Sequence, residues 1–126
     1  MLIDYTKWCN AIEIKIQSKR IVIFNVYLPY QCQENEDTYL NCLGDLHVML
    51  EELDSTCYAV IGDWNADLRD SPSSLFAHYM LSFCNEHDLC ISSINKLPSD
   101  GHTCVSSAWG SVSWLDHIVT SDLRLR

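Results

Sequence analysis

The sequence predicts an α/β fold in which two β-sheets are flanked by helices. Apolar residues alternate with polar ones at a period of two in some segments and recur every three or four residues in others. Taken in order, the segments read as two strands, a helix, a strand, a helix and three short strands, an order that suits a layered sandwich. A chain of 126 residues allows one domain at most.

The first two strands form a predicted hairpin. Isoleucines alternate with polar residues over 12–16, which predicts a half-buried strand whose Glu13 faces solvent. The mostly apolar segment 21–28 predicts the second strand, and Pro29 ends it because proline has no N–H to donate. The turn between them, at 18–20, lacks the glycine that hairpins favour.

Two helices and further strands follow. Leucines at three- and four-residue spacing predict an amphipathic helix over 36–53, with acidic residues in its first turn. Ser71-Pro72 predicts the start of a second helix, because serine caps helices and proline suits the first helical position. Its expected apolar face comprises Leu75, Phe76, Tyr79, Met80 and Phe83, and the other expected strands are 58–61, 88–91, 102–105 and 114–119.

Composition limits the functions that the chain can have. The net charge is −9, which counts against simple electrostatic binding to nucleic acid, and the acidic groups at 34–37 and 51–54 are expected on one solvated helix surface. Neither a signal peptide nor an apolar run of about 20 residues is visible. Seven cysteines, an odd number, predict free thiols and an intracellular protein, nuclear or cytoplasmic.

The most informative segment follows the strand expected at 58–61. Gly62 ends this strand, and Asp63 and Asn65 come directly after it with one residue between them. In α/β sheets, ligands gather at the carboxyl ends of strands. An aspartate can act as a base, and an asparagine amide can donate to an anionic oxygen, so the pair suits attack of water on a phosphodiester. The alternative is an Asx-rich turn without catalytic function.

Two other segments complete a pattern. Asn25-Val-Tyr-Leu-Pro29 ends another strand, and Ser113-Trp-Leu-Asp-His-Ile118 lies near the end of the chain. With Gly62-Asp-Trp-Asn65, these segments make the chain resemble the endonuclease/exonuclease/phosphatase superfamily, whose fold is that of DNase I. The endonuclease domains of non-LTR retrotransposons are the most similar group, and Thr103 fits the threonine that they carry.

The resemblance implies a fold, a reaction and a role for each matched residue. The fold would be part of the DNase I-like four-layer sandwich, and the reaction magnesium-dependent cleavage of DNA. Asp63 would orient or deprotonate the attacking water, Asn65 would donate to a phosphoryl oxygen, and Tyr27 would present its hydroxyl to the same phosphate. Asp116 would orient the family's catalytic histidine, and Thr103 would contact nucleic acid.

The chain departs from the family pattern at both ends. The family's metal-binding glutamate strand is not found upstream of Trp8, so the metal ligands are unknown, and Mg²⁺ is expected only for the complete domain. The family's Ser-Asp-His segment is not matched either, because Leu123 follows Ser121-Asp122. Residues 1–126 are therefore expected to be one partial domain, truncated at both ends and inactive alone.

Two other functions remain open. The chain could be a non-catalytic relic or interaction module with the same fold, or a phosphatase of the same superfamily. Inositol phosphatases carry Trp-Cys-Asp-Arg where this chain has Trp114-Leu-Asp-His117, so only the tryptophan and aspartate match. His117 is expected to point away from Asp116, because neighbouring side chains on a strand face opposite sides. Cys84, His87 and Cys90 have the spacing of zinc ligands, but no fourth ligand is evident.

Overall fold

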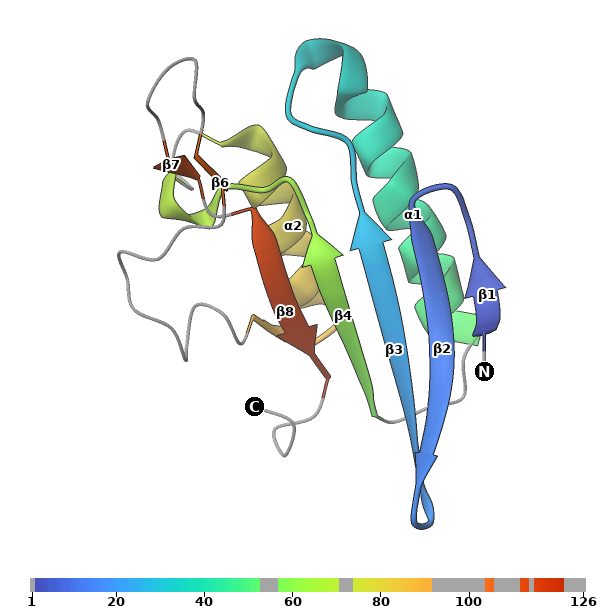
Figure 1. The fold of residues 1–126 in the computed structure, drawn as a ribbon. Coiled ribbons are helices and arrows are strands. Elements are labelled where there is room, and N and C mark those ends of the chain that lie inside the picture. Colours follow the sequence, from blue (N-terminus) through green and yellow to red (C-terminus); the bar gives the residue numbers. More distant parts are fainter. Residues whose placement is uncertain are drawn as a thin grey trace.

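The computed structural model of the chain describes residues 2–52, 57–70, 74–91, 104–105, 112–113 and 115–121. Six strands form one sheet in the order β1-β2-β3-β4-β8-β5, and β6 and β7 form a separate pair. Helices α1 (Glu36–Glu52) and α2 (Leu75–Glu86) lie side by side on one face of the large sheet (Figure 1). The strands are β1 Leu2–Tyr5, β2 Cys9–Ile16, β3 Lys19–Tyr27, β4 Tyr58–Asp63, β5 Cys90–Ile91, β6 Cys104–Val105, β7 Val112–Ser113 and β8 Asp116–Thr120.

The topology places the carboxyl ends of two central strands beside the start of a third. β3 and β4 are parallel and are connected through α1, whereas β8 runs antiparallel to β4 on its other side. The last residues of β3 and β4 and the first residue of β8 therefore meet at one edge of the sheet (Figure 1). This is the edge at which α/β sheets bind their ligands.

The predicted hairpin of β2 and β3 is confirmed, but its turn is shorter than expected. Ile16 pairs with Lys19, so only Gln17 and Ser18 form the loop, and the turn predicted at 18–20 begins one residue and ends two residues too late. Gln17 has a φ of 57°, in the left-handed region that tight hairpin turns require. The glutamine therefore adopts the conformation for which glycine was expected.

The face of β2 that lies under the helices is the opposite of the predicted one. Ala11 pairs with Phe24 and both are fully buried, so the isoleucines of β2 lie on the other face, where Ile12 and Ile16 are 37% and 54% exposed. Glu13 therefore does not face solvent. Its side chain is 12% exposed and pairs with Arg20 at 3.0 Å, and this contact lowers the pKa of the glutamate.

The helices agree with the leucine and aromatic spacing, except at the start of α2. α1 begins at Glu36, as predicted, and is described as far as Glu52, while residue 53, the predicted last residue, lies outside the described part. α2 begins at Leu75 with Ser74 as its N-cap, and the Ser74 side chain accepts a hydrogen bond from the Ala77 N–H at 3.2 Å. The predicted start at Ser71-Pro72 is therefore wrong, since Ser74 is the serine whose side chain accepts a backbone N–H of the first turn. Residues 71–73 themselves lie outside the described part.

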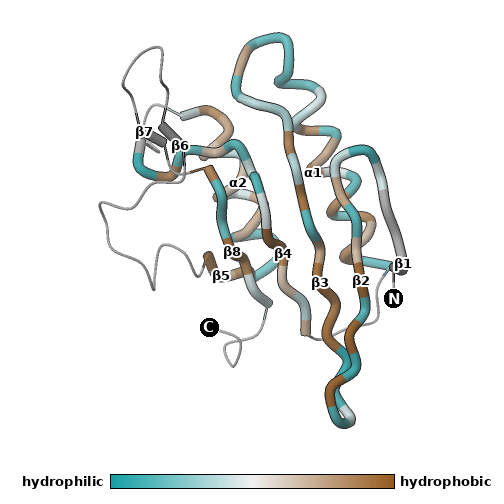
Figure 2. The backbone as a smooth tube through the Cα atoms, viewed as in Figure 1, coloured by the Kyte–Doolittle hydropathy of each residue, from teal (hydrophilic) through white to brown (hydrophobic). Residues whose placement is uncertain are grey.

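The core lies between the helices and the covered face of the sheet. Trp64 is its largest fully buried side chain, and Tyr39 of α1 stacks on Phe76 of α2 with ring centroids 4.0 Å apart. Brown, apolar segments run along β2 and β3 (Figure 2), and part of this apolar surface is on the uncovered face of the sheet. None of the described helices is both long and apolar enough to cross a membrane.

A matched pair of glycine substitutions tests the close contact between β3 and β4. Gly62 has a φ of 122°, and a Cβ at this position would clash with the Val26 carbonyl oxygen. We expect Gly62→Ala to lower the free energy of unfolding by more than about 1 kcal/mol, because alanine at positive φ is strained and the clash adds to that strain. The measurement is urea unfolding followed by circular dichroism.

The control is Gly44→Ala in α1. A Cβ on Gly44 has no neighbour within 4 Å. Alanine should therefore raise the free energy of unfolding by about 0.5–1 kcal/mol, as glycine-to-alanine changes do inside helices. Equal effects of the two substitutions would contradict the close approach of the strands.

The uncovered sheet face predicts self-association of the 126-residue chain. Ile12 and Ile118 are 37% and 50% exposed on this face, and exposed apolar sheet surface promotes association. We expect oligomers in size-exclusion chromatography with light scattering, and a lower mean mass for the Ile12→Thr/Ile118→Thr variant. Val48→Thr on α1 is the matched control, since Val48 is also 50% exposed. A monodisperse monomer of the unchanged chain would disprove the expectation.

Candidate functional site

Three of the predicted site residues form one row across the sheet. Tyr27 of β3 is the register partner of Asp63 of β4, and Asp63 is in turn the partner of Asp116 of β8. Side chains at partnered positions of neighbouring strands point to the same face. The row therefore lies on the face opposite the helices, with Tyr27 65% exposed, Asp116 exposed and Asp63 half-buried.

The turn after β4 alternates between the core and this open face. Val60 is fully buried, Asp63 points to the open face, and Trp64 returns to the core, where none of its surface is exposed. Both backbone polar groups of Trp64 are hydrogen-bonded. Its N–H donates to the Leu115 carbonyl at 3.0 Å, and its carbonyl accepts from the Tyr39 hydroxyl at 2.8 Å. The buried tryptophan thus fixes the backbone that carries Asp63.

Asn65 completes the turn in a left-handed conformation, with a φ of 47°. Its N–H donates to Oδ1 of Asp63 at 2.9 Å, and its side-chain Nδ2 donates to the Leu28 carbonyl at 2.6 Å. An amide nitrogen carries two hydrogens, so one of them is used in holding the end of β3 to the turn. Asn65 therefore orients the carboxylate of Asp63 directly.

His117 supports the turn from the core side. It is 1% exposed, whereas its neighbour Asp116 is exposed, so the prediction that the two point in opposite directions is confirmed. The His117 Nε2 lies 2.8 Å from the carbonyl oxygen of Ala66, and Nε2 must be the donor because a carbonyl only accepts. His117 therefore has a structural contact on the side away from the open face.

The environment of Asp63 disfavours its charged form. Burial raises the pKa of this carboxyl, the N–H of Asn65 lowers it, and the nearby Asp116 raises it again, with burial the largest effect. The two carboxylates are partners across an antiparallel pair, where like charges destabilise the sheet. The site thus places two acids together and raises the pKa of the more buried one.

Other residues of the sequence motifs lie elsewhere. Thr103 and Trp114 are outside the described residues. Ser121, from the Ser-Asp pair that resembles the family's closing segment, exchanges hydrogen bonds with the Tyr58 backbone at 2.8 and 3.0 Å, which is a structural role at the far end of β4. Cys84 of the possible zinc spacing is 3% exposed, and burial raises its pKa to about 12, so its thiol is poorly suited to bind a metal.

The residues that support the turn were missed by sequence reasoning. Trp64, Tyr39 and Leu115 contribute through burial and backbone contacts, which a motif does not display. The burial of Trp64 could have been predicted, because tryptophan side chains are highly buried on average.

Comparison with protein-family models and with curated proteins finds no match for the sequence. Solved structures do match. An endonuclease/exonuclease/phosphatase family protein of Leptotrichia buccalis C-1013-b aligns with a TM-score of 0.66 and 19% identity, over 90% of this chain and 42% of that one. Mannosyl-6-phosphatase Bt3783 of Bacteroides thetaiotaomicron VPI-5482 aligns with a TM-score of 0.60 and 15% identity, over 91% and 43%.

The catalytic domain of human nocturnin is a third match, with a TM-score of 0.56 and 17% identity, over 90% of this chain and 40% of that one. The chain spans about two fifths of the length of the structures it matches. At these identities the likeness concerns the fold alone. The chain therefore has a partial DNase I-like α/β fold, the fold of the structures that it matches.

Proposed function

We propose that the chain forms part of a phosphodiester-cleaving site of the retrotransposon endonuclease type, with DNA as substrate. The observation that carries this proposal is the row of Tyr27, Asp63 and Asp116 at the carboxyl edge of the sheet. Motifs far apart in the sequence supply these residues, and the fold brings them to one face. The three sequence motifs favour an endonuclease over the other activities of the superfamily.

Each side chain has a task that suits phosphodiester hydrolysis. Asp63 is oriented by the Asn65 N–H, and its raised pKa makes it a better proton acceptor than an ordinary aspartate. The second hydrogen of the Asn65 amide would donate to a phosphoryl oxygen. Tyr27 is exposed on the same face, and Asp116 would orient a histidine from another segment, as in a hydrolytic triad.

A divalent cation suits the two carboxylates. Mg²⁺ prefers oxygen ligands and is commonly bound through one or two carboxylates together with substrate phosphates. Asp63 and Asp116 repel one another, and a cation near both would relieve that repulsion. When bound, the ion would stabilise negative charge on the phosphoryl oxygens.

Much of the negative charge of the chain lies away from the proposed site. It therefore opposes DNA binding there less than the net charge of −9 suggests. Glu36, Asp37, Glu51 and Glu52 are in α1, on the face of the sheet opposite the proposed site, and Glu34 precedes them in a short 3₁₀ helix, Gln33–Asn35. The expectation of one solvated helix surface holds only in part, because Glu34 precedes α1, Glu36 is half-buried and residue 54 lies outside the described part. Screening at physiological salt acts over about 8 Å, so charges on the far face are weakly felt at the site.

A phosphatase is the second candidate. The observation in its favour is the likeness of the fold to mannosyl-6-phosphatase Bt3783. Release of inorganic phosphate from a sugar phosphate, without nicking of DNA, would identify this alternative. A non-catalytic relic would show neither activity.

The decisive test is plasmid nicking with Mg²⁺. We expect no nicking by the 126 residues alone, since the family's glutamate and histidine are not matched in them. Loss of general acid–base help costs on the order of 10²–10⁴ in rate. A longer polypeptide, extended on both sides by its adjoining coding sequence, should nick, and Asp63→Ala should abolish the activity. Asp45→Ala, an exposed aspartate of α1, is the control that should leave nicking unchanged.

One result would refute this proposal, and a second would contradict the expectation that the 126 residues are inactive alone. Nicking by the extended polypeptide that persists in Asp63→Ala would show that the row of acids is not the site. Magnesium-dependent nicking by the 126-residue chain, lost in Asp63→Ala, would show that no further segment is needed.

The paired carboxylates also predict a pH-dependent gain of stability in Asp63→Asn. The folded-state pKa of Asp63 is raised, so its charge disfavours folding once the pH rises through that pKa. Asparagine removes the charge and keeps an Oδ1 acceptor for the Asn65 N–H. We expect a higher Tm than that of the unchanged protein at pH 7, and no difference below about pH 3.9, the pKa of an unperturbed aspartate. Asp45→Asn should show no comparable gain, and a lower Tm of Asp63→Asn at pH 7 would contradict the repulsion.

A further inference from the structure

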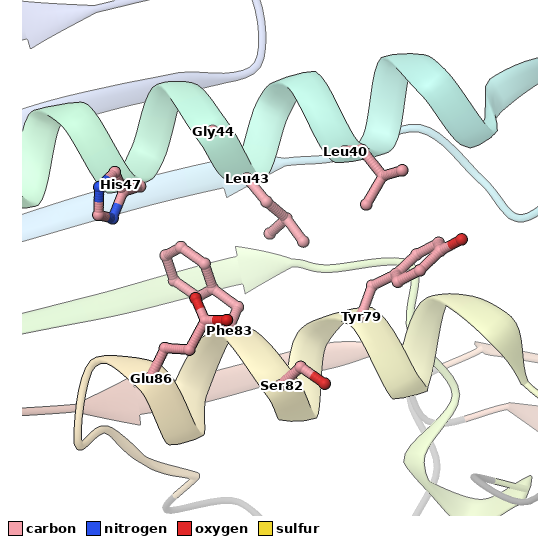
Figure 3. A pocket seen from close by; sticks show the side chains of 8 residues that line it. All are labelled: Leu40, Leu43, Gly44, His47, Tyr79, Ser82, Phe83 and Glu86. Atoms are coloured by element: carbon pink, nitrogen blue, oxygen red, sulfur yellow. The ribbon is translucent and has the colours of Figure 1, made fainter.

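A second cluster of chemically active side chains lies on the helical face, away from the proposed site. α1 and α2 enclose a groove of about 410 Å³ between them. Figure 3 shows His47 of α1 at one end of this groove, with Phe83 and Glu86 of α2 facing it. Because the sheet separates this groove from the row of Tyr27, Asp63 and Asp116, a function here is independent of the proposed nuclease activity.

Three metal-ligating side chains converge next to this end of the groove. His47 and Glu51 are four residues apart on α1, a spacing that puts both on one side of the helix. His87 follows the last residue of α2. One ligand atom from each residue lies within 4.8 Å of the others, and the His47 Nδ1 is 3.0 Å from the His87 Nε2. His47 and Glu51 are exposed and His87 is half-buried, so ions can reach them from solvent.

The backbone that carries His87 is firmly held. The Leu89 N–H donates to the Cys84 carbonyl at 2.8 Å and the Asp88 N–H to the Asn85 carbonyl at 3.3 Å, which is the Schellman arrangement at a helix C-terminus. Asp88 has the left-handed φ of 53° that this arrangement needs. The ring of Phe83 lies 4.5 Å from the ring of His87, centroid to centroid, and limits its rotation.

The contact between the two imidazoles is one that a metal ion can replace. For the two nitrogens to share a hydrogen bond, one must donate a proton and the other must be unprotonated. Burial and the neighbouring His47 lower the pKa of His87, against the opposing effect of Glu51 and Glu86, and the neutral imidazole is the form that binds metals. Two nitrogens on a tetrahedral Zn²⁺ are about 3.4 Å apart, because Zn–N bonds are about 2.0–2.1 Å long. The observed 3.0 Å therefore needs only a small widening.

We propose that His47, Glu51 and His87 bind a divalent transition-metal ion of the Zn²⁺ class and thereby clamp α1 to α2. Two imidazoles and a carboxylate are ligands that suit Zn²⁺ or Ni²⁺, whereas Mg²⁺ favours all-oxygen sites. With three protein ligands, a fourth position stays open to water or to a side chain of another molecule.

The test is calorimetric titration of the reduced 126-residue chain with ZnCl₂. We expect one Zn²⁺ to bind per chain, with an affinity that falls at least about tenfold in His47→Asn and in His87→Asn, since each loses a direct ligand. His78→Asn is the matched control, because His78 is an exposed histidine of α2 outside the cluster, and its affinity should be unchanged. Circular dichroism checks that the variants fold.

Thermal unfolding provides a second measurement. Zn²⁺ should raise the Tm of the unchanged chain and of His78→Asn, because a ligand that binds only the folded state stabilises it, and this rise should be absent in the cluster variants. Either of two results would overturn the proposal. One is no Zn²⁺ binding, and the other is binding of equal affinity in His47→Asn and His87→Asn, which would assign the ion to other ligands such as the cysteine thiols or the carboxylates of Asp63 and Asp116.

Discussion

The close approach of β3 to β4 at Val26 and Gly62 is the constraint on which the site depends. Gly62 is a register partner of Val26, and no side chain fits between its Cα and the Val26 carbonyl. This contact fixes the parallel register, and one residue further along it makes Tyr27 the partner of Asp63. The pairing continues past the strand ends, where the Leu28 N–H donates to the Asp63 carbonyl at 2.9 Å. A shift of one residue would move Asp63 to the helical face.

The turn after β4 is organised by the side chains that it buries. Trp64 enters the core and Ala66 is fully buried behind it, so Asp63 and Asn65, which lie between, are left with the open face and the strand ends. Contacts from α1, from the residue after β3 and from β8 hold the turn through Tyr39, Leu28 and His117. The polar residues that suit phosphoester chemistry therefore belong to a rigid segment, as precise positioning of a catalytic group requires.

Predictions from local sequence patterns were reliable where a single physical effect determined the structure. The leucine spacing predicted the start of α1 at Glu36, and the alternation of strand side chains placed Asp116 and His117 on opposite faces. The buried face of β2 could not be predicted, because it depends on the pairing of Ala11 with Phe24, which is a tertiary contact. The start of α2 at Ser74 and the meeting of His47 with His87 likewise depend on contacts between distant residues.

Asn65 meets two requirements that few residues satisfy together. The left-handed backbone at this position admits glycine, asparagine and aspartate most readily. The bond from Nδ2 to the Leu28 carbonyl needs a side-chain donor, which glycine and ionised aspartate lack. Folding by itself thus demands an asparagine here, whether or not the chain hydrolyses anything. A related protein without hydrolytic activity would therefore retain this asparagine, and the Gly-Asp-x-Asn motif can persist without the reaction associated with it.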